Sequence, residues 1–369
     1  MRIILSALCL TTGLFAAAIS ENPDTPFKLA TFEANGKTAV GMVLDDRLVL
    51  ELAGANAHLT KQAKLPQVRI PGEMKELIEQ YSSVNKRLYQ IANYYKANPP
   101  GKQPFAYTVD QVAYKAPIQY PWNLLAIAAN YPSHAAGMGA SRQGGDQPAA
   151  ARPPGGFDAS VISKIVPDRD APIFFAKSPR SCIIDPGATY YIPPGRERID
   201  WEGELAIIIG KPARLVPKDK THDYVFGYSI MYDLSDRGGG APRRTVSMFP
   251  GANWFEGKSI DRGAPFGPVI VPKEFIPNYE DLHLVTKVNG EVMQDDYPRS
   301  MIWKEPQMVS YLSEILTLYP GDVISSGTPA GTGMERQKFL KADDVVSIEI
   351  DKIGTLTTHI QAWPAKGSK

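Results

Sequence analysis

Short apolar segments separated by turn-forming residues fill the chain from Pro121 onward, and this pattern limits the possible folds more than any other feature. Each segment has the length of a β-strand, and most are bounded by Gly, Pro, Asn, Asp or Ser. They span residues 124–129, 173–177, 204–209, 224–233, 267–271, 282–290, 322–327 and 345–350. One helical pattern interrupts them at 306–318, with Pro320-Gly321 after its end. Many short strands with few helices predict a β-rich α+β fold built as a barrel or clip.

The region before residue 121 predicts a smaller α+β unit. Residues 27–52 form short apolar pieces around turn signals at 35–36 and 45–46, which is typical of a three-stranded meander. Residues 73–97 repeat apolar side chains at spacings of three and four and end at Asn-Pro-Pro-Gly, which predicts one helix. No cluster of catalytic residue types falls here. We therefore interpret residues 21–120 as an accessory domain for packing or dimerisation.

Residues 1–20 have the pattern of an export signal. Arg2 precedes an uncharged apolar run that ends at Ala18, and Ala18-Ile19-Ser20 fits a small-x-small cleavage site. The run is shorter than the roughly 20 apolar residues that a membrane-spanning helix needs. We therefore expect a signal peptide cut after Ser20, and a periplasmic or secreted protein that does not stay in the membrane. Cleavage removes Cys9 and leaves Cys182 alone, so no intramolecular disulfide can form.

The balance of charges excludes several classes of partner. The chain has 40 Lys and Arg against 39 Asp and Glu, for a net charge of +1. No global field therefore attracts nucleic acid or an anionic membrane. A hydrophobic fraction of 43% and a charged fraction of 21% are ordinary for a globular domain, and they exclude a disordered chain or a coiled coil.

Two glutamates separated by one residue suggest a metal site. Glu202 and Glu204 stand at the start of a predicted buried strand, where residues i and i+2 point to the same side. Two buried like charges repel each other, and a divalent cation would relieve both the repulsion and the cost of burial. Oxygen ligands without a nearby His or Cys favour Mg²⁺, Mn²⁺ or Ca²⁺ over Zn²⁺. Asp233, at the end of the next predicted strand, is a candidate third ligand. The alternative is an ordinary solvated strand face.

Five motifs in a fixed order resemble the fumarylacetoacetate hydrolase family. They are D-W-E-G-E-L-A-I-I-I-G-K, G-Y-S-I-M-Y-D-L-S-D-R, G-K-S-I-D, V-N-G-E-V-M-Q and Y-P-G-D-V-I-S-S-G-T-P-A-G-T-G. The resemblance covers residues 121–365 and implies a mixed β-sandwich roll as the catalytic domain, often dimeric. It also implies that Glu202, Glu204 and Asp233 bind Mg²⁺ or Mn²⁺.

The same resemblance implies a general base. The stretch N-Y-P-S-H at 130–134 is similar to the family's N-Y-x-x-H, whose histidine often activates water. This assigns the base to His134 and a substrate contact to Tyr131. Many members carry an acidic residue three positions after the histidine, where this chain has Gly137. Asp146 is one candidate to replace it, within the Gly-rich segment 137–156 that we expect to be a lid or a loop.

Four further residues match positions that act on substrate in the family. Lys258, in the G-K-S motif, is implied to stabilise negative charge on a substrate oxygen or enolate. Lys177 is similar to an F-x-K position that lines the same cleft. Thr328 and Arg237 match positions that hold a substrate carboxylate. The sequence departs from the family around Arg237, where Tyr232 replaces an Asn and Gly-rich sequence replaces a Gln, so we expect altered substrate contacts there.

The implied activity is metal-assisted hydrolysis of a C–C bond in a small 1,3-diketo or acylpyruvate-type acid, a reaction of aromatic catabolism. His134 would deprotonate the attacking water, and Lys258 would stabilise the departing enolate. An isomerase or decarboxylase of 2-oxo or 2-hydroxydienoate acids, of the 5-carboxymethyl-2-hydroxymuconate isomerase type, is the alternative that Gly137 favours. A lyase of ureido acids and a non-catalytic binding protein on the same scaffold also stay open. The expected partners are a small oxo acid and a second copy of the chain, with no nucleic acid.

Overall fold

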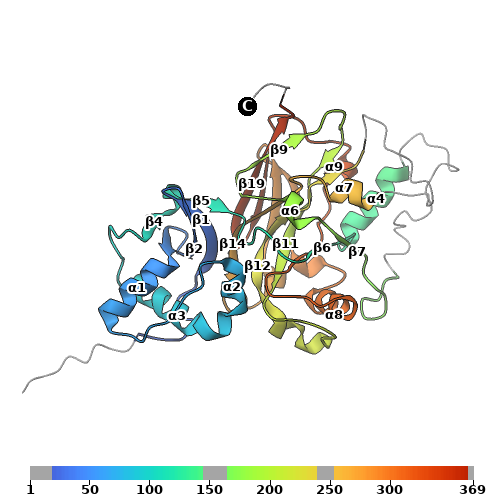
Figure 1. Cartoon of the computed structure of the whole chain (residues 1–369). Coiled ribbons are helices and arrows are strands. Elements are labelled where there is room, and N and C mark those ends of the chain that lie inside the picture. The colour runs from blue at the N-terminus through green and yellow to red at the C-terminus, as the bar shows by residue number, and fades with distance from the viewer. Residues whose placement is uncertain (1–18, 144–163, 239–252, 365–369) are drawn as a thin grey trace, which may run out of the picture.

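Two β-sheets form the body of the molecule in the computed structural model, which describes residues 19–143, 164–238 and 253–364 (Figure 1). The main path of the larger sheet runs β4 (Ala106–Thr108), β3 (Leu48–Glu51), β2 (Lys37–Leu44), β1 (Lys28–Ala34), β14 (Ala264–Pro272), β12 (Val225–Tyr232), β11 (Gly203–Ile209), β17 (Val323–Ser325), β6 (Leu124–Ile127) and β7 (Phe174–Ala176). Beside this path, β5 (Ala113–Lys115) pairs with β1 and β8 (Ile183–Ile184) pairs with β14. The short strands β10 (Ile199–Asp200) and β13 (Ser235–Asp236) pair with each other.

A second sheet packs against the middle of the first. Its order is β16 (Glu291–Asp296), β15 (Leu284–Val288), β18 (Val345–Ile350), β19 (Gly354–Ala362) and β9 (Thr189–Ile192). β19 packs against β14, β18 against β12, and β15 against β11. Every residue of β11 and β12 is buried, because these strands are covered on both faces. The site residues that lie on or beside these two strands, described below, are buried for the same reason.

The predicted sheet-rich α+β class is confirmed. Each of the eight apolar segments overlaps a strand, and the segment 345–350 coincides with β18. The helix predicted at 306–318 is α8 (Glu305–Ile315), which begins with Pro306 in its first turn. The finer description as a sandwich roll stays a prediction.

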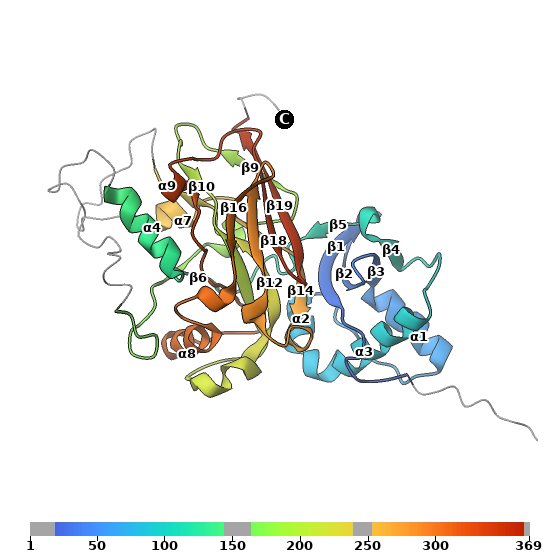
Figure 2. The same cartoon turned by 180° about the vertical axis from the view of Figure 1, so that it is seen from behind.

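The N-terminal meander is confirmed as β1, β2 and β3, paired antiparallel. A helix that was not predicted follows it, α1 (Leu52–Ala63). The single helix predicted at 73–97 is two helices, α2 (Met74–Glu79) and α3 (Tyr81–Ala97). They part at Gln80, whose φ of −94° and ψ of 10° leave the helical region while the apolar spacing continues. Figure 2 shows these helices beside β1 to β3, and β1 joins the larger sheet through β14. The division of the chain at residue 120 stays a prediction.

Short helices surround one end of the sheets. α4 (Pro132–Gln143) covers the ends of β6 and β7, with α6 (Pro179–Cys182), α7 (Trp254–Lys258) and α9 (Gly333–Arg336) nearby (Figure 1). Helices of the 3-10 type are η1 (Val109–Gln111), η3 (Lys218–Tyr224), η4 (Lys273–Phe275), η5 (Tyr279–Asp281) and η6 (Pro298–Ser300). The sequence predicts a lid or a loop at 137–156, and a loop is wrong for its first part, because α4 runs to Gln143 and packs on α9. The remainder, with Asp146, lies outside the described residues.

The predicted signal peptide lies almost wholly outside the described residues, which begin at Ile19. Within the three described ranges, no helix combines the length and the apolar character needed to cross a membrane.

Candidate metal centre and active site

Three carboxylates converge where β11 lies beside β12. Glu202 precedes β11, Glu204 lies within it, and Asp233 directly follows β12. The antiparallel register places Gly203 opposite Tyr232, so the three side chains meet at the same end of the strand pair. One carboxylate oxygen of each lies within 4.8 Å of the others, and all three side chains are buried. The structure therefore brings together the three predicted metal ligands.

The charges of this cluster fit a divalent cation. Burial, together with the neighbouring Asp233 and Glu202, raises the pKa of Glu204 to about 8. Burial acts in the same direction on Glu202, but Arg237 and Lys258 outweigh it and hold the pKa of Glu202 well below its usual range. A cation bound between these oxygens would relieve the repulsion that acts on Glu204. Hard carboxylate oxygens are the donors that Mg²⁺ and Mn²⁺ prefer.

Two lysines neutralise Asp233 from opposite sides. Lys258, the last residue of α7, donates to Glu202 and to Asp233 and lines the cavity of the site. Burial acts to lower the pKa of Lys258, but the two carboxylates raise it above its usual value, so the ammonium is charged. Lys177, just after β7, places its Nζ 2.6 Å from Asp233 Oδ1 and 3.2 Å from the carbonyl of Leu234. Lys177 is fully buried and is absent from the cavity wall, so it lies behind the carboxylate cluster and not in the predicted substrate contact.

Arg237 also binds carboxylates of the chain itself. Its Nε donates to Asp200 over 2.9 Å and its Nη2 donates to Glu202. The buried Asp200 carboxylate also accepts the backbone N–H groups of Gly333 and, over 3.2 Å, Met334. These contacts join Arg237 to the first turn of α9. The predicted contact of Arg237 with a substrate carboxylate would have to use its remaining donors, although the side chain does line the cavity.

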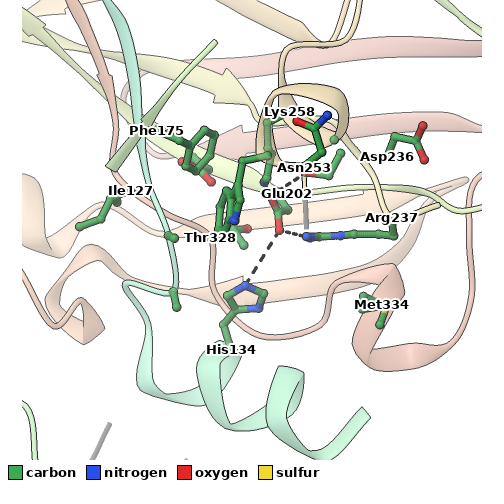
Figure 3. A pocket seen from close by; sticks show the side chains of 16 residues that line it. Ile127, His134, Phe175, Glu202, Asp236, Arg237, Asn253, Lys258, Thr328 and Met334 are labelled. Atoms are coloured by element: carbon green, nitrogen blue, oxygen red, sulfur yellow. Dashed lines mark hydrogen bonds and ion pairs between the residues drawn. The ribbon is translucent and has the colours of Figure 1, made fainter. Parts of the chain in front are cut away.

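His134 is anchored through one ring nitrogen and faces the carboxylate cluster with the other. It lies in the first turn of α4, and its Nδ1 hydrogen-bonds to Glu335 of α9. Its Nε2 is 4.0 Å from Glu202 Oε1, and Figure 3 shows the ring rising toward Glu202. The other oxygen of Glu335 accepts the Gly331 N–H over 2.6 Å. An imidazole with one nitrogen anchored and the other facing the site is placed as a general base.

Glu335 supplies the acidic partner that the sequence lacks at position 137. A Cβ on Gly137 would lie 2.8 to 3.0 Å from the Cδ, Cγ and Oε2 atoms of Glu335, so the glycine provides the room for this carboxylate. Sequence reasoning missed Glu335, which is 201 residues from His134 along the chain. One local signal was available, because Thr332 and Glu335 form the T-x-x-E pattern of a helix start and the Thr332 side chain caps α9.

The two remaining predicted substrate contacts differ in position. Thr328 lines the cavity, and its hydroxyl donates to the Gly203 carbonyl over 3.0 Å and accepts from Gln294 over 2.7 Å. Tyr131 is fully buried outside the cavity wall, and its hydroxyl has no hydrogen-bond partner among the described residues. The structure therefore does not bring Tyr131 into contact with the cavity.

The site opens into a cavity of about 180 Å³. Its polar lining includes the predicted residues His134, Glu202, Glu204, Arg237, Lys258 and Thr328. Sequence reasoning missed an apolar part made by Ile127, Phe175, Trp254 and Met334, and also Asn253 at the start of α7.

Comparison with known proteins finds a matching family and several similar proteins. A family model described as "Fumarylacetoacetate (FAA) hydrolase C-terminal" matches residues 123–361. The oxaloacetate tautomerase YisK of Bacillus subtilis is 32% identical over 336 residues, which are 90% of this chain and 99% of that protein. The structure of 5-carboxymethyl-2-hydroxymuconate delta-isomerase from Mycobacterium smegmatis is 25% identical with a TM-score of 0.60, covering 92% of this chain and 100% of the other. Maleylpyruvate hydrolase from Sphingobium sp. SYK-6, solved with manganese(II) and pyruvate, shares the fold at 24% identity, with a TM-score of 0.62 over 91% of this chain and 100% of the other.

Proposed function

Because the chain belongs to the fumarylacetoacetate hydrolase family, we propose that it moves a proton at the carbon beside the keto group of a small 2-oxo acid, as a metal-dependent tautomerase or isomerase. Its relatives are hydrolases, isomerases and a tautomerase, so the chain is an enzyme, and the non-catalytic alternative is set aside. The observation that carries the proposal is the His134 ring, anchored by Glu335 and directed at the carboxylate cluster. The nearly full-length match to an oxaloacetate tautomerase supports proton transfer ahead of hydrolysis.

Glu202, Glu204 and Asp233 would hold the metal through their clustered oxygens. We propose Mg²⁺ or Mn²⁺, and the manganese bound to the maleylpyruvate hydrolase neighbour supports this choice. When bound, the cation supplies Lewis-acid polarisation of the keto group. Lys177 and Lys258 hold Asp233 in place by pairing with its two oxygens.

His134 would take the proton from the carbon through Nε2. Its Nδ1 hydrogen bond to Glu335 orients the ring and stabilises the imidazolium that forms. Lys258 lines the cavity as a charged ammonium and would face the negative charge that develops on the enolate oxygen. His134 would then return the proton to oxygen or to carbon, which completes the tautomerisation without loss or gain of atoms.

Hydrolysis of an acylpyruvate-type acid is the second candidate, because the His134–Glu335 pair equally fits activation of water. In that reaction His134 takes a proton from water, and the hydroxide oxygen bonds to the distal carbonyl carbon. The C–C bond then breaks, its electron pair leaves as an enolate, and the enolate takes up the proton. The products are a carboxylate and a 2-oxo acid.

Proton exchange tests the proposal directly. Protein loaded with Mn²⁺ or Mg²⁺ should exchange the methyl protons of pyruvate with deuterium from D₂O, as followed by NMR. His134→Asn and Glu204→Gln should each abolish the exchange. His222→Asn is the matched control, because His222 also pairs through Nδ1 with a glutamate, Glu305 at 2.9 Å, but does not line the cavity.

A second measurement separates the two candidates. Acylpyruvates incubated in H₂¹⁸O should yield a labelled new carboxylate only if the enzyme hydrolyses them. Exchange that persists in His134→Asn would contradict the proposed base. Labelled product without any carbon-bound proton exchange would replace the tautomerase with the hydrolase.

We also propose that the protein is exported after cleavage following Ser20, and that it is a homodimer. The apolar run before Ala18 and the small residues at the cleavage site support export. Mass spectrometry of the protein from the cell envelope should find Glu21 as the first residue, and light scattering should give twice the mass of one chain. Full-length protein in the cytosol would contradict export.

A further inference from the structure

One part of the cavity wall is aromatic, and the proposed chemistry does not use it. Phe175 of β7 and Trp254 of α7 lie with ring centroids 5.2 Å apart and planes tilted by 46°. Ile127 of β6 also lines the cavity, although the pairing with β7 places it opposite Phe174 and not opposite Phe175. In Figure 3, Ile127 and Phe175 lie on one side of Glu202, while Arg237 and Asp236 lie on the other. The labelled aromatic residue Phe175 and the charged residues Arg237 and Asp236 therefore lie on opposite sides of the cavity, with Met334 on the side of Arg237.

The aromatic wall adjoins the reacting position. The Lys258 ammonium is 5.1 Å from the centroid of the Phe175 ring, and Lys258 also contacts Glu202 and Asp233. A substrate whose oxo-acid head lies at the carboxylate cluster would therefore extend its third and later carbons along Phe175. Trp254 is 40% exposed even though it contacts Phe175, so it presents apolar surface that a substrate can cover.

The cations that line the cavity are already paired within the part of the chain that the structure describes. Lys258 pairs with Glu202 and Asp233, Arg237 with Asp200 and Glu202, and His134 with Glu335. Among the described residues, a carboxylate at the far end of the substrate would find no unpaired cation beside the aromatic rings and would lose its water against them. Desolvation of an unpaired charge is costly, whereas burial of an apolar group is favourable.

We propose that Phe175 and Trp254 form the specificity subsite for the substrate's tail, and that they select an uncharged apolar tail over a second carboxylate. The substrate class is then a 2-oxo acid with an alkyl, alkenyl or aryl tail. This inference rests on the proposed function only for the position of the oxo-acid head.

Three acids test the tail directly. 5-Methyl-2-oxohexanoate and 2-oxoglutarate have the same length and differ by an isopropyl group in place of the distal carboxylate, and pyruvate is the head alone. Dissociation constants are measured by calorimetry on the Mn²⁺-loaded protein. We expect 5-methyl-2-oxohexanoate to bind at least about tenfold more tightly than 2-oxoglutarate, as apolar pockets discriminate by such factors.

Trp254→Ala should remove most of this margin, the tenfold ratio between the dissociation constants of 2-oxoglutarate and 5-methyl-2-oxohexanoate. It should leave the dissociation constant of pyruvate unchanged within about twofold. Phe255→Ala is the matched control, because Phe255 is the next residue of α7, is 70% exposed and does not line the cavity. It should keep the full margin. Phe175→Leu, which retains an apolar side chain, should reduce the margin partially.

Tighter or equal binding of 2-oxoglutarate would overturn the inference, as would equal losses in Trp254→Ala and Phe255→Ala. A failure of the proposed function shows differently. It would appear as the absence of pyruvate exchange dependent on His134, while the ratio of the two tailed acids still reports on the subsite.

Discussion

Replacing Gly137 with alanine should lower the activity of this enzyme by displacing Glu335, and it should lower the stability as well. Gly137 lies inside α4, where alanine favours the helix by about 1 kcal/mol relative to glycine. The new Cβ would lie 2.8 Å from Cδ and 2.9 Å from Cγ of Glu335. These atoms belong to a flexible side chain, so Glu335 would move and the helix backbone would stay.

This movement of Glu335 would remove the anchor of His134, the proposed base. Glu335 would lose its hydrogen bonds to His134 and to the Gly331 N–H, and hydrogen bonds to charged groups contribute roughly 1.5–3 kcal/mol each. The two hydrogen bonds together are worth roughly 3–6 kcal/mol, and the helix gain offsets about 1 kcal/mol of this, so we expect the free energy of unfolding to fall by roughly 2–5 kcal/mol. An unanchored imidazole forfeits much of the roughly 10²–10⁴-fold that general base catalysis contributes. We therefore expect kcat to fall about 100-fold.

The assay is the kcat of pyruvate deuterium exchange, measured beside urea unfolding for Gly137→Ala, Glu335→Ala and the double variant. If the alanine acts through Glu335, the double variant should lose no more activity than Glu335→Ala alone, because the two changes share one contact. A Gly137→Ala protein with wild-type kcat would refute the reasoning. The reasoning would also be refuted if the double variant lost kcat by the product of the two single losses.

Three further outcomes follow from the site and from the N-terminal region. Glu204→Gln should weaken Mn²⁺ binding at least about tenfold in calorimetric titration, because it removes one of the three proposed ligands. The same change should not lower the melting temperature of the metal-free protein, because burial and two acidic neighbours already raise the pKa of Glu204 to about 8. When free Mn²⁺ is present at 100 times its Kd for the protein, removing it with a chelator should lower the free energy of unfolding by about 2.7 kcal/mol. At the same Mn²⁺ concentration, this loss should be much smaller for Glu204→Gln. Burial, reinforced by Glu274, raises the pKa of Tyr89 to about 12, so the stability that depends on its protonated hydroxyl is present below its usual pKa of 10.0 and is lost as the pH rises toward 12. Urea unfolding between these pH values should show this loss, and Tyr89→Phe should make the profile flatter.

The strands and the carboxylate cluster were predictable because their signals are local. A buried strand is an apolar run of limited length, and β18 follows its run residue by residue. Side chains two apart on a strand share a face, which is why Glu202 and Glu204 could be paired before their positions were known. The break between α2 and α3 was not predictable in this way, since the apolar spacing continues through Gln80.

Contacts between distant parts of the chain decided the rest of the site. The sequence alone determined which residue types were available: an E-x-E pair, a following Asp, a histidine and a lysine in motif order. Only the tertiary structure placed Glu335 against His134 across 201 residues, turned Lys177 away from the cavity toward Asp233, and set Trp254 against Phe175. No periodicity along the chain encodes such pairs, because they depend on how β7, α4, α7 and α9 pack around the end of the sheet. The glycine at 137 illustrates the difference, since it marks a missing acid in the sequence and the space for a distant one in the fold.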